Sequence, residues 1–183
     1  MVTSLDITRT VIHYRTQLDE IRLRVHGDDT LLENAGWTEA RCAVRAGAAA
    51  RELTAARAAL VAVWAAPSGD AFQAMSEPLP AGLAAAERLL AALGTGLVQL
   101  GTALRQAQTR IDNRRQAFAD WSAAVQSLSG PFDALLQLVR QEGEQAVSEA
   151  EEVARWFDQA LAQFIVTTTP LTREVAAAAA ITP

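Results

Sequence analysis

The sequence predicts an all-α protein: an elongated antiparallel helical bundle built on one long helical hairpin, with two additional amphipathic helices. Apolar residues recur at alternating steps of three and four along most of the chain, the spacing of one packed helix face. Alanine, the strongest helix former, is abundant. No stretch alternates apolar and polar residues as a half-buried strand would.

The first predicted helix covers residues 4–26. It ends at the break His26-Gly27-Asp28-Asp29, where glycine frees the backbone from helical geometry. Its apolar stripe consists of Ile7, Val11, Tyr14, Leu18, Ile21 and Val25. This stripe predicts an amphipathic helix that packs against the hairpin.

The hairpin is predicted over about residues 36–128. Its first helix, about 38–65, is so rich in alanine that its buried face is less clear. The break Ala66-Pro67-Ser68-Gly69 ends that helix. Pro78 and Pro80 interrupt a short turn before a long helix from about 81 to 128, because proline disfavours helix at the preceding residue.

The long helix carries the clearest apolar stripe, which only Arg114 interrupts. A helix of this length, on the order of 70 Å, is not stable in water without neighbours along it. We therefore take the stripe as a candidate interaction seam. Its residues include Leu90, Leu93, Leu97, Leu100, Leu104, Ile111, Phe118 and Trp121.

The last predicted helix covers residues 132–166 and follows the break Ser129-Gly130-Pro131. Thr167-Thr168-Thr169-Pro170 is expected to close it and to leave residues 167–183 as a tail or linker. We expect residues 1–166 to form a single bundle in which the first and last helices partly replace a partner of the hairpin.

Composition excludes several functions. All 16 basic residues are arginines, so a phosphate-loop lysine, a pyridoxal Schiff base and a kinase ion pair are impossible. The net charge of −5 gives nucleic-acid binding little support. The amino-terminal sequence lacks the pattern of a secretory signal peptide. The uncharged run 89–104 falls short of the roughly 18 apolar residues expected of a spanning helix, so we expect no membrane partner.

No catalytic or metal-binding pattern accompanies the helices. His13 and His26 have no glutamate three positions before them, as a di-iron site in a helical bundle would need. The single cysteine, Cys42, is expected to be a small buried side chain without reactivity. The five glutamates between 142 and 152 are expected to form a solvated face rather than a metal site. We predict that the protein is not an enzyme and has no cofactor, no metal and no catalytic residue.

A motif stands between the two hairpin helices: Trp64-Ala65-Ala66-Pro67-Ser68-Gly69-Asp70-Ala71-Phe72, followed by Pro78-Leu79-Pro80. A large ring, then proline, glycine and a second ring allow two helices to reverse and pack the rings in the crook. The plain alternative is a helix-capping loop. The candidate hairpin-turn residues are Trp64, Pro67, Gly69, Asp70, Phe72, Pro78 and Pro80.

These residues resemble the WXG-type, early-secreted-antigen-like helical hairpins of type VII secretion, in the actinobacterial branch. The resemblance covers about residues 36–128 and departs from the family in two places. Ala66 stands where the family has glycine. The family's export signal, a tyrosine with an acid four positions on, is absent, because the only tyrosine is Tyr14 and Leu18 follows it.

The resemblance implies a non-enzymatic secretion-associated protein, such as an export module, secreted substrate or partner chaperone, that acts through helix–helix contacts. It implies a protein partner: another helical hairpin protein, a secretion ATPase or a toxin cargo. It also implies secretion without a signal peptide, or a cytoplasmic location before export. Two alternatives stay open: a stand-alone structural or adaptor bundle, and a membrane-active protein with residues 89–104 inserting.

Overall fold

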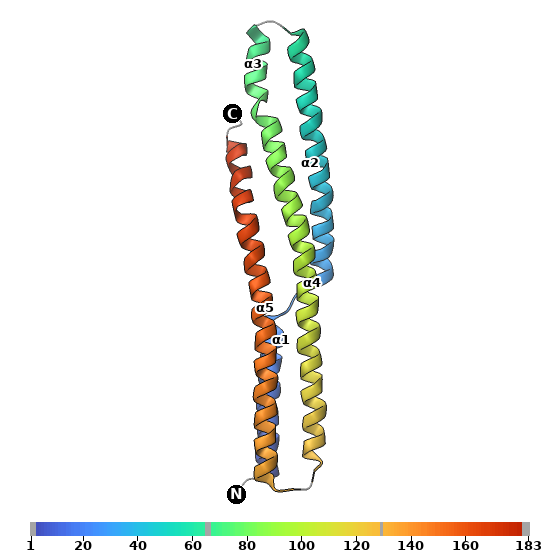
Figure 1. The fold of residues 1–183 in the computed structure, drawn as a ribbon, viewed down its shortest axis with the longest axis vertical. Helices are drawn as coiled ribbons and strands as arrows, with labels where there is room; N and C mark the ends of the chain where they lie inside the picture. Colours follow the sequence, from blue (N-terminus) through green and yellow to red (C-terminus); the bar gives the residue numbers. More distant parts are fainter. Residues whose placement is uncertain (1–2, 65–66, 129, 181–183) are drawn as a thin grey trace. The chain divides into compact units, whose positions relative to one another are not determined.

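A computed structural model describes residues 3–64, 67–128 and 130–180 (Figure 1). These residues are almost entirely helical and contain no β-strand, which confirms the all-α helical-bundle prediction. The α-helices, in chain order, are α1 (Ser4–Arg24), α2 (Asp29–Val63), α3 (Pro67–Ser76), α4 (Pro78–Gln126) and α5 (Phe132–Ala180).

The chain folds as two compact units, each assembled from segments far apart in sequence. Unit 1 consists of residues 1–29 and 102–160, and unit 2 of residues 30–101 and 161–183. The division falls within residues 1–166, the range predicted as a single bundle. α1 has 21 residues and α4 has 49, so at about 1.5 Å per residue α1 can cover less than half of α4.

Unit 1 packs α1, the second part of α4 and the first part of α5 around large side chains. All six stripe residues of α1 are buried, as predicted. The Tyr14 ring lies edge-on to Phe118 of α4, with centroids 6.3 Å apart, and fills the space beside Gly143 of α5 that a side chain there would need. Other buried apolar residues of this unit are Leu104, Ala107, Ile111, Val125, Leu135, Leu136, Val139, Ala146, Ala150 and Ala154.

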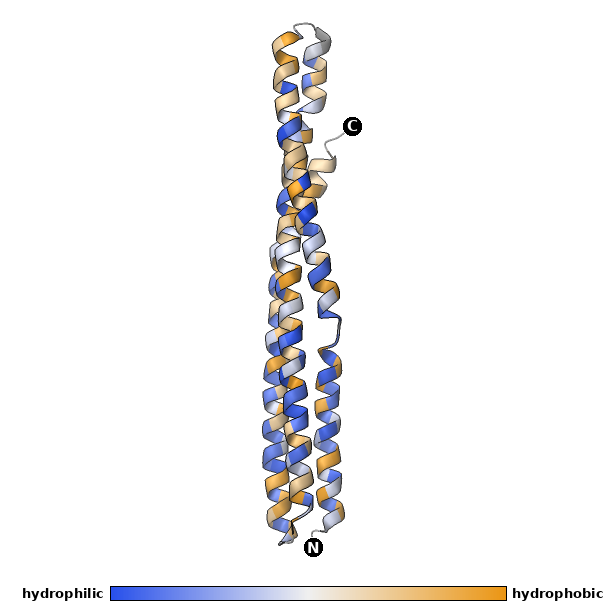
Figure 2. Ribbon diagram, turned by 90° about the vertical axis from the view of Figure 1, so that its right-hand side faces the viewer, coloured by the Kyte–Doolittle hydropathy of each residue, from blue (hydrophilic) through white to orange (hydrophobic). Residues whose placement is uncertain are grey.

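Unit 2 packs α2, α3, the first part of α4 and the end of α5 around small side chains. α2 and α4 approach so closely that a methyl group on Gly94 would lie 2.9 Å from the backbone oxygen of Gly36. Its buried apolar side chains are mainly alanines. Hydropathy differs as well: in Figure 2 the α2–α3 end of the ribbon is mostly pale and orange, whereas blue turns are frequent around α1.

Two of the hairpin boundaries differ from the prediction. α2 begins at Asp29 rather than near 38, and Gly36 lies within it because the missing side chain allows α4 to approach. The expected turn before 81 is also short. Pro78 opens α4 and Pro80 lies in its first turn, where the N–H that proline lacks has no helical partner to lose.

The predicted tail, residues 167–183, is also wrong where the structure describes it, because α5 continues through Pro170 to Ala180. The hydroxyls of Thr167 and Thr169 donate to the carbonyls four residues earlier, at 2.9 and 2.7 Å, and so stay inside the helix. The alanines from 176 favour helix, and Glu174 forms an ion pair with Arg88 of α4.

Candidate functional site

The hairpin-turn motif brings its two rings together. Trp64 directly follows α2, and its ring centroid lies 6.0 Å from that of Phe72 in α3, with the ring planes inclined by 34°. Gly69 is buried under Trp64, because a side chain there would lie 2.6 Å from the Trp64 carbonyl oxygen. The ring contact predicted from the sequence is confirmed. Position 69 must be glycine because the Trp64 carbonyl leaves no space for a side chain there.

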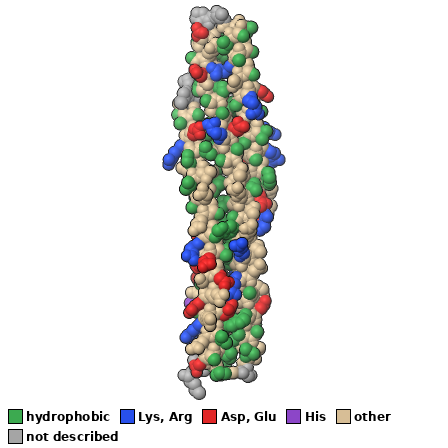
Figure 3. Space-filling view, viewed as in Figure 1, with side chains coloured by type: hydrophobic (Ala, Val, Ile, Leu, Met, Phe, Trp, Pro, Cys, Tyr) green, Lys and Arg blue, Asp and Glu red, His purple; other side chains and the backbone are tan. Residues whose placement is uncertain are grey.

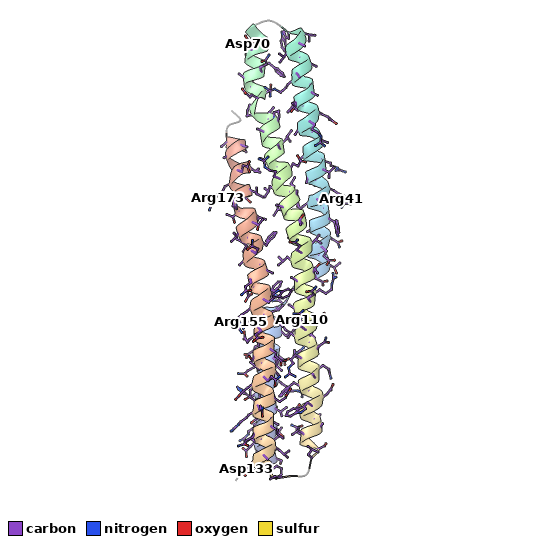
Figure 4. All side chains as sticks on the ribbon, viewed as in Figure 1. Arg41, Asp70, Arg110, Asp133, Arg155 and Arg173 are labelled. Atoms are coloured by element: carbon purple, nitrogen blue, oxygen red, sulfur yellow. The ribbon has the colours of Figure 1, made fainter. Side chains whose placement is uncertain are left out.

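The remaining motif residues open the helices around the turn. Pro67 is the first residue of α3, and Asp70 is exposed in its first turn, where a negative charge suits the amino-terminal end of a helix (Figure 4). Pro78 and Pro80 are half-buried in the first turn of α4. Ala66, the departure from the family pattern, lies outside the described residues.

The turn presents an apolar surface. Trp64 keeps 42% of its area exposed and Phe72 keeps 37%, so their contact covers only part of either ring. Other large apolar side chains within a few residues of them in sequence are also exposed, namely Leu60, Val61, Val63, Met75 and Leu79.

The predicted interaction seam of α4 is divided between the two units. In unit 1, Leu104, Ile111 and Phe118 are buried by α1 and α5, and Trp121 is half-buried. In unit 2, Leu100 is buried, whereas the other three seam residues, Leu90, Leu93 and Leu97, are only half-buried. One continuous stripe is therefore a completed core at one end and a partly covered face at the other.

Arg114, which interrupts the seam, is neutralised by α5. Its Nη2 donates a hydrogen bond to Glu142 at 2.8 Å. Its Nε forms an ion pair with Glu149 at 2.8 Å, but the N–H bond does not point at the carboxylate, so this contact is not a hydrogen bond. Glu151 accepts from Arg24 of α1 at 2.7 Å. The predicted solvated glutamate face is therefore in part an ion-pair face within unit 1.

A groove of about 450 Å³ lies between α2 and α4 in unit 2. Its lining residues are Gly47, Ala50, Arg51, Thr54, Ala55 and Ala58 of α2 and Pro80, Ala84 and Glu87 of α4. The groove exists because glycine and alanine side chains fill little of the space between the two helix backbones. Figure 3 shows arginines and hydrophobic side chains interspersed on the visible surface.

The sequence interpretation missed this groove because the alanine-rich helix showed no obvious face. The signal that could have revealed it is a second stripe at alternating steps of four and three. We call it the α2 stripe; it consists of Trp37, Arg41, Val44, Ala48, Arg51, Ala55, Ala58 and Ala62. All of these residues are exposed except Ala48, which is half-buried.

Other titratable groups form a structural cluster rather than a reactive one. A second groove in unit 1 is lined by Arg15, Asp19, Asp112 and Arg115 among others. Arg115 pairs with both aspartates, and the hydrogen bond that it donates to Asp19 is the main cause that raises its pKa above the ordinary value. Among the described residues, no group of three or more His, Cys, Asp or Glu side chains could hold a metal ion.

One stretch, Gly69–Gln126, is long and apolar enough to cross a membrane by length and composition, and 11% of its most apolar window is buried. The same test is passed by core helices of soluble proteins. Only an 18-residue part of the stretch is that apolar, because the whole of it spans α3 and α4 and carries charged residues such as Arg110 and Asp112.

The geometry defines an all-α helical-bundle protein in which one apolar stripe is only partly covered. A scan of the sequence against protein-family models found no match, and searches of curated proteins and of solved structures found none either.

Proposed function

We propose that this chain is a non-enzymatic, type VII secretion-associated helical protein that acts through helix–helix contacts, as an export module, secreted substrate or partner chaperone. Its partner is another protein: a helical hairpin, a secretion ATPase or a toxin cargo. Neither nucleic acid nor a cofactor takes part. It leaves the cell by a route that needs no signal peptide, or stays cytoplasmic until export.

The observation that carries this proposal is the unequal cover of α4. Leu104 and Phe118 are 1% and 0% exposed, whereas Leu90, Leu93 and Leu97 in the same stripe are only half-buried. Burying apolar area is worth roughly 25 cal/mol per Å². A protein that completes the cover of unit 2 therefore gains binding free energy without any chemistry.

The motif supports the secretion part of the proposal. Trp64 and Phe72 meet at 6.0 Å beside the buried Gly69, and this compact turn supports the resemblance to a WXG-type hairpin. The tyrosine-based export signal is missing from this chain. We therefore propose that a partner supplies that signal when the chain is exported.

Secretion is tested in the native host by measuring extracellular chain with and without the ATPase of its type VII system. We expect the extracellular amount to fall when the ATPase is deleted, and to fall with Trp64→Ala but not with Trp156→Ala. Trp156 is a matched control because it is similarly exposed, at 37%, but lies in unit 1. Unchanged export in the ATPase deletion would favour a stand-alone adaptor bundle.

A membrane-active protein is the second candidate, and the apolar stretch Gly69–Gln126 favours it. In that case α4 would leave its helical neighbours and insert. Dye-loaded vesicles of phosphatidylcholine, with and without phosphatidylglycerol, test this directly. Leakage above the background at any pH between 4 and 8 would support insertion, and its absence would remove the candidate.

A further inference from the structure

The α2 stripe has the spacing of a helix-packing seam, but its side chains are exposed except for Ala48, so no described helix of unit 2 covers it. Trp37 and Val44 are 61% and 69% exposed, which is high for apolar side chains on a long helix. Arg51, Ala55 and Ala58 of the stripe also line the groove between α2 and α4. The stripe and the groove therefore form one surface in unit 2.

Two exposed arginines of this surface have no acidic partner among the described residues. Neither Arg41 nor Arg51 forms an ion pair there, and Arg41 donates to the Thr38 hydroxyl at 3.3 Å. The acid of the groove, Glu87, packs its carboxylate against Gly47 instead of pairing with Arg51. In unit 2 the ion pair between Arg88 and Glu174 lies elsewhere, between α4 and α5. In unit 1 five arginines form ion pairs: Arg22, Arg24, Arg105, Arg114 and Arg115.

We propose that the α2 stripe and the adjoining groove bind one amphipathic helix of another protein, with an apolar seam and two acidic residues placed to meet Arg41 and Arg51. The arginines are ten residues apart on α2, about 15 Å along the axis. The acids of the partner helix are therefore ten or eleven positions apart. This inference rests on the proposed function, since it specifies the partner surface of the same unit.

A helix is the occupant that these residues favour over other anionic ligands. The alanines and glycine of the groove allow two helix axes to approach closely, as ridges enter grooves. Val44 and Ala48 separate the arginines with apolar surface, which matches a helix seam but not a continuous phosphate backbone. The exposed tryptophan at position 37 adds a large apolar contact at one end.

The test is selection from a phage-displayed library of helical peptides with a fixed leucine seam and randomised flanking positions. On the full chain we expect enrichment of Asp and Glu at two flanking positions ten or eleven apart. On the double variant Arg41→Glu with Arg51→Glu we expect the same positions to select Arg and Lys. The best acidic peptide should bind that variant about tenfold more weakly or worse.

Two further variants separate the surface from general charge. Ala55→Trp fills the groove and should abolish enrichment, whereas Arg173→Glu, an exposed arginine of α5 in the same unit, should change nothing. Both variants must keep the helical circular dichroism and melting temperature of the parent. Enrichment without charge preference, or unaffected by Ala55→Trp, would overturn the proposal.

Two other occupants would also overturn it. One is a homodimer in light scattering that Ala55→Trp dissociates, because a second copy would then cover the surface. The other is binding to phosphatidylglycerol vesicles that the double arginine variant abolishes while no helix is selected. If no helix is selected but export still needs the ATPase, the docking proposal is wrong and the secretion proposal is kept. If a helix is selected but export does not depend on the ATPase, the docking proposal is kept and the secretion proposal is wrong.

Discussion

Unit 1 and unit 2 share the same two long helices, yet they bury side chains of different size. In unit 1 the interior holds Tyr14, Phe118, Leu18 and Ile111, all at or below 9% exposure. In unit 2 the buried apolar positions are mainly alanines, and the leucines of α4 stay half-covered. Since packing free energy grows with buried apolar area, unit 1 has more internal stabilisation per helix than unit 2.

The two units also treat charge differently. The ion pairs of unit 1 link α1, α4 and α5, as in Arg22 with Asp112 at 3.0 Å and Arg24 with Glu151 at 2.7 Å. Arg41 and Arg51 of unit 2 have no such pair among the described residues. Together these differences suggest that unit 1 is complete by itself, whereas unit 2 gains most from a partner, which is why both proposals concern unit 2.

The strongest test of this comparison is a matched pair of phenylalanine truncations. Phe118→Ala removes a ring that is 0% exposed in unit 1, and we expect it to lower the free energy of unfolding by about 3–5 kcal/mol. Phe72→Ala removes a ring that is 37% exposed in unit 2, and we expect a loss of about 1 kcal/mol. Urea unfolding followed by circular dichroism measures both. Equal losses would mean that the two units are equally well packed.

The second test uses the same substitution at two glycines of α4. Gly94→Ala places a methyl 2.9 Å from two backbone atoms of α2, and we expect it to cost about 1–3 kcal/mol. Gly82→Ala meets only Ala178 at 3.9 Å, an ordinary contact, and we expect a gain of about 0.5–1 kcal/mol from helix propensity. Thermal unfolding should therefore shift in opposite directions, and a gain at both sites would contradict the close approach.

Much of the fold could be predicted from periodicity alone. The α1 stripe and the ends of α1 follow from apolar spacing and the Gly27 break, because a helix with one apolar face must bury it. The helical course of α5 beyond 166 could not be predicted. The Arg88–Glu174 pair there joins two helices that are far apart in sequence. The threonine hydroxyls bond to carbonyls four residues earlier, but the sequence equally allows them to end the helix.

The candidate site was only partly predictable. The Trp64–Phe72 contact follows from motif spacing, since the turn leaves the rings little other room. Division of the seam could not be predicted, because Leu97 and Leu104 occupy equivalent positions of the stripe and differ only in which helix lies over them. The groove depends on Gly47 and Ala55, whose lack of bulk has no periodic signature as strong as that of leucine.

Arg114 gives a third, smaller test, of the charge difference between the units. Arg114→Met leaves Glu142 and Glu149 without their cation in a partly buried place, and we expect a loss of about 1–2 kcal/mol. Arg24→Met, whose ion pair is more exposed, should cost about 0.5 kcal/mol. Adding Glu142→Gln and Glu149→Gln to Arg114→Met should recover stability in urea unfolding. A failure to recover would show that the arginine stem, not its charge, matters.

The smallest expected effect is a pH dependence confined to unit 1, which holds the only tyrosine. Burial raises the pKa of Tyr14 above its ordinary value near 10, and Glu144 raises it further. Because the folded state favours the protonated phenol, its stabilisation is complete below pH 10 and is lost as pH rises through the folded pKa. Absorbance at tyrosinate wavelengths should give a higher midpoint for the folded chain than for the chain in urea. A folded midpoint at or below the unfolded one would mean that α1 leaves Tyr14 open to water, and the contrast between a closed unit 1 and a partly open unit 2 would disappear.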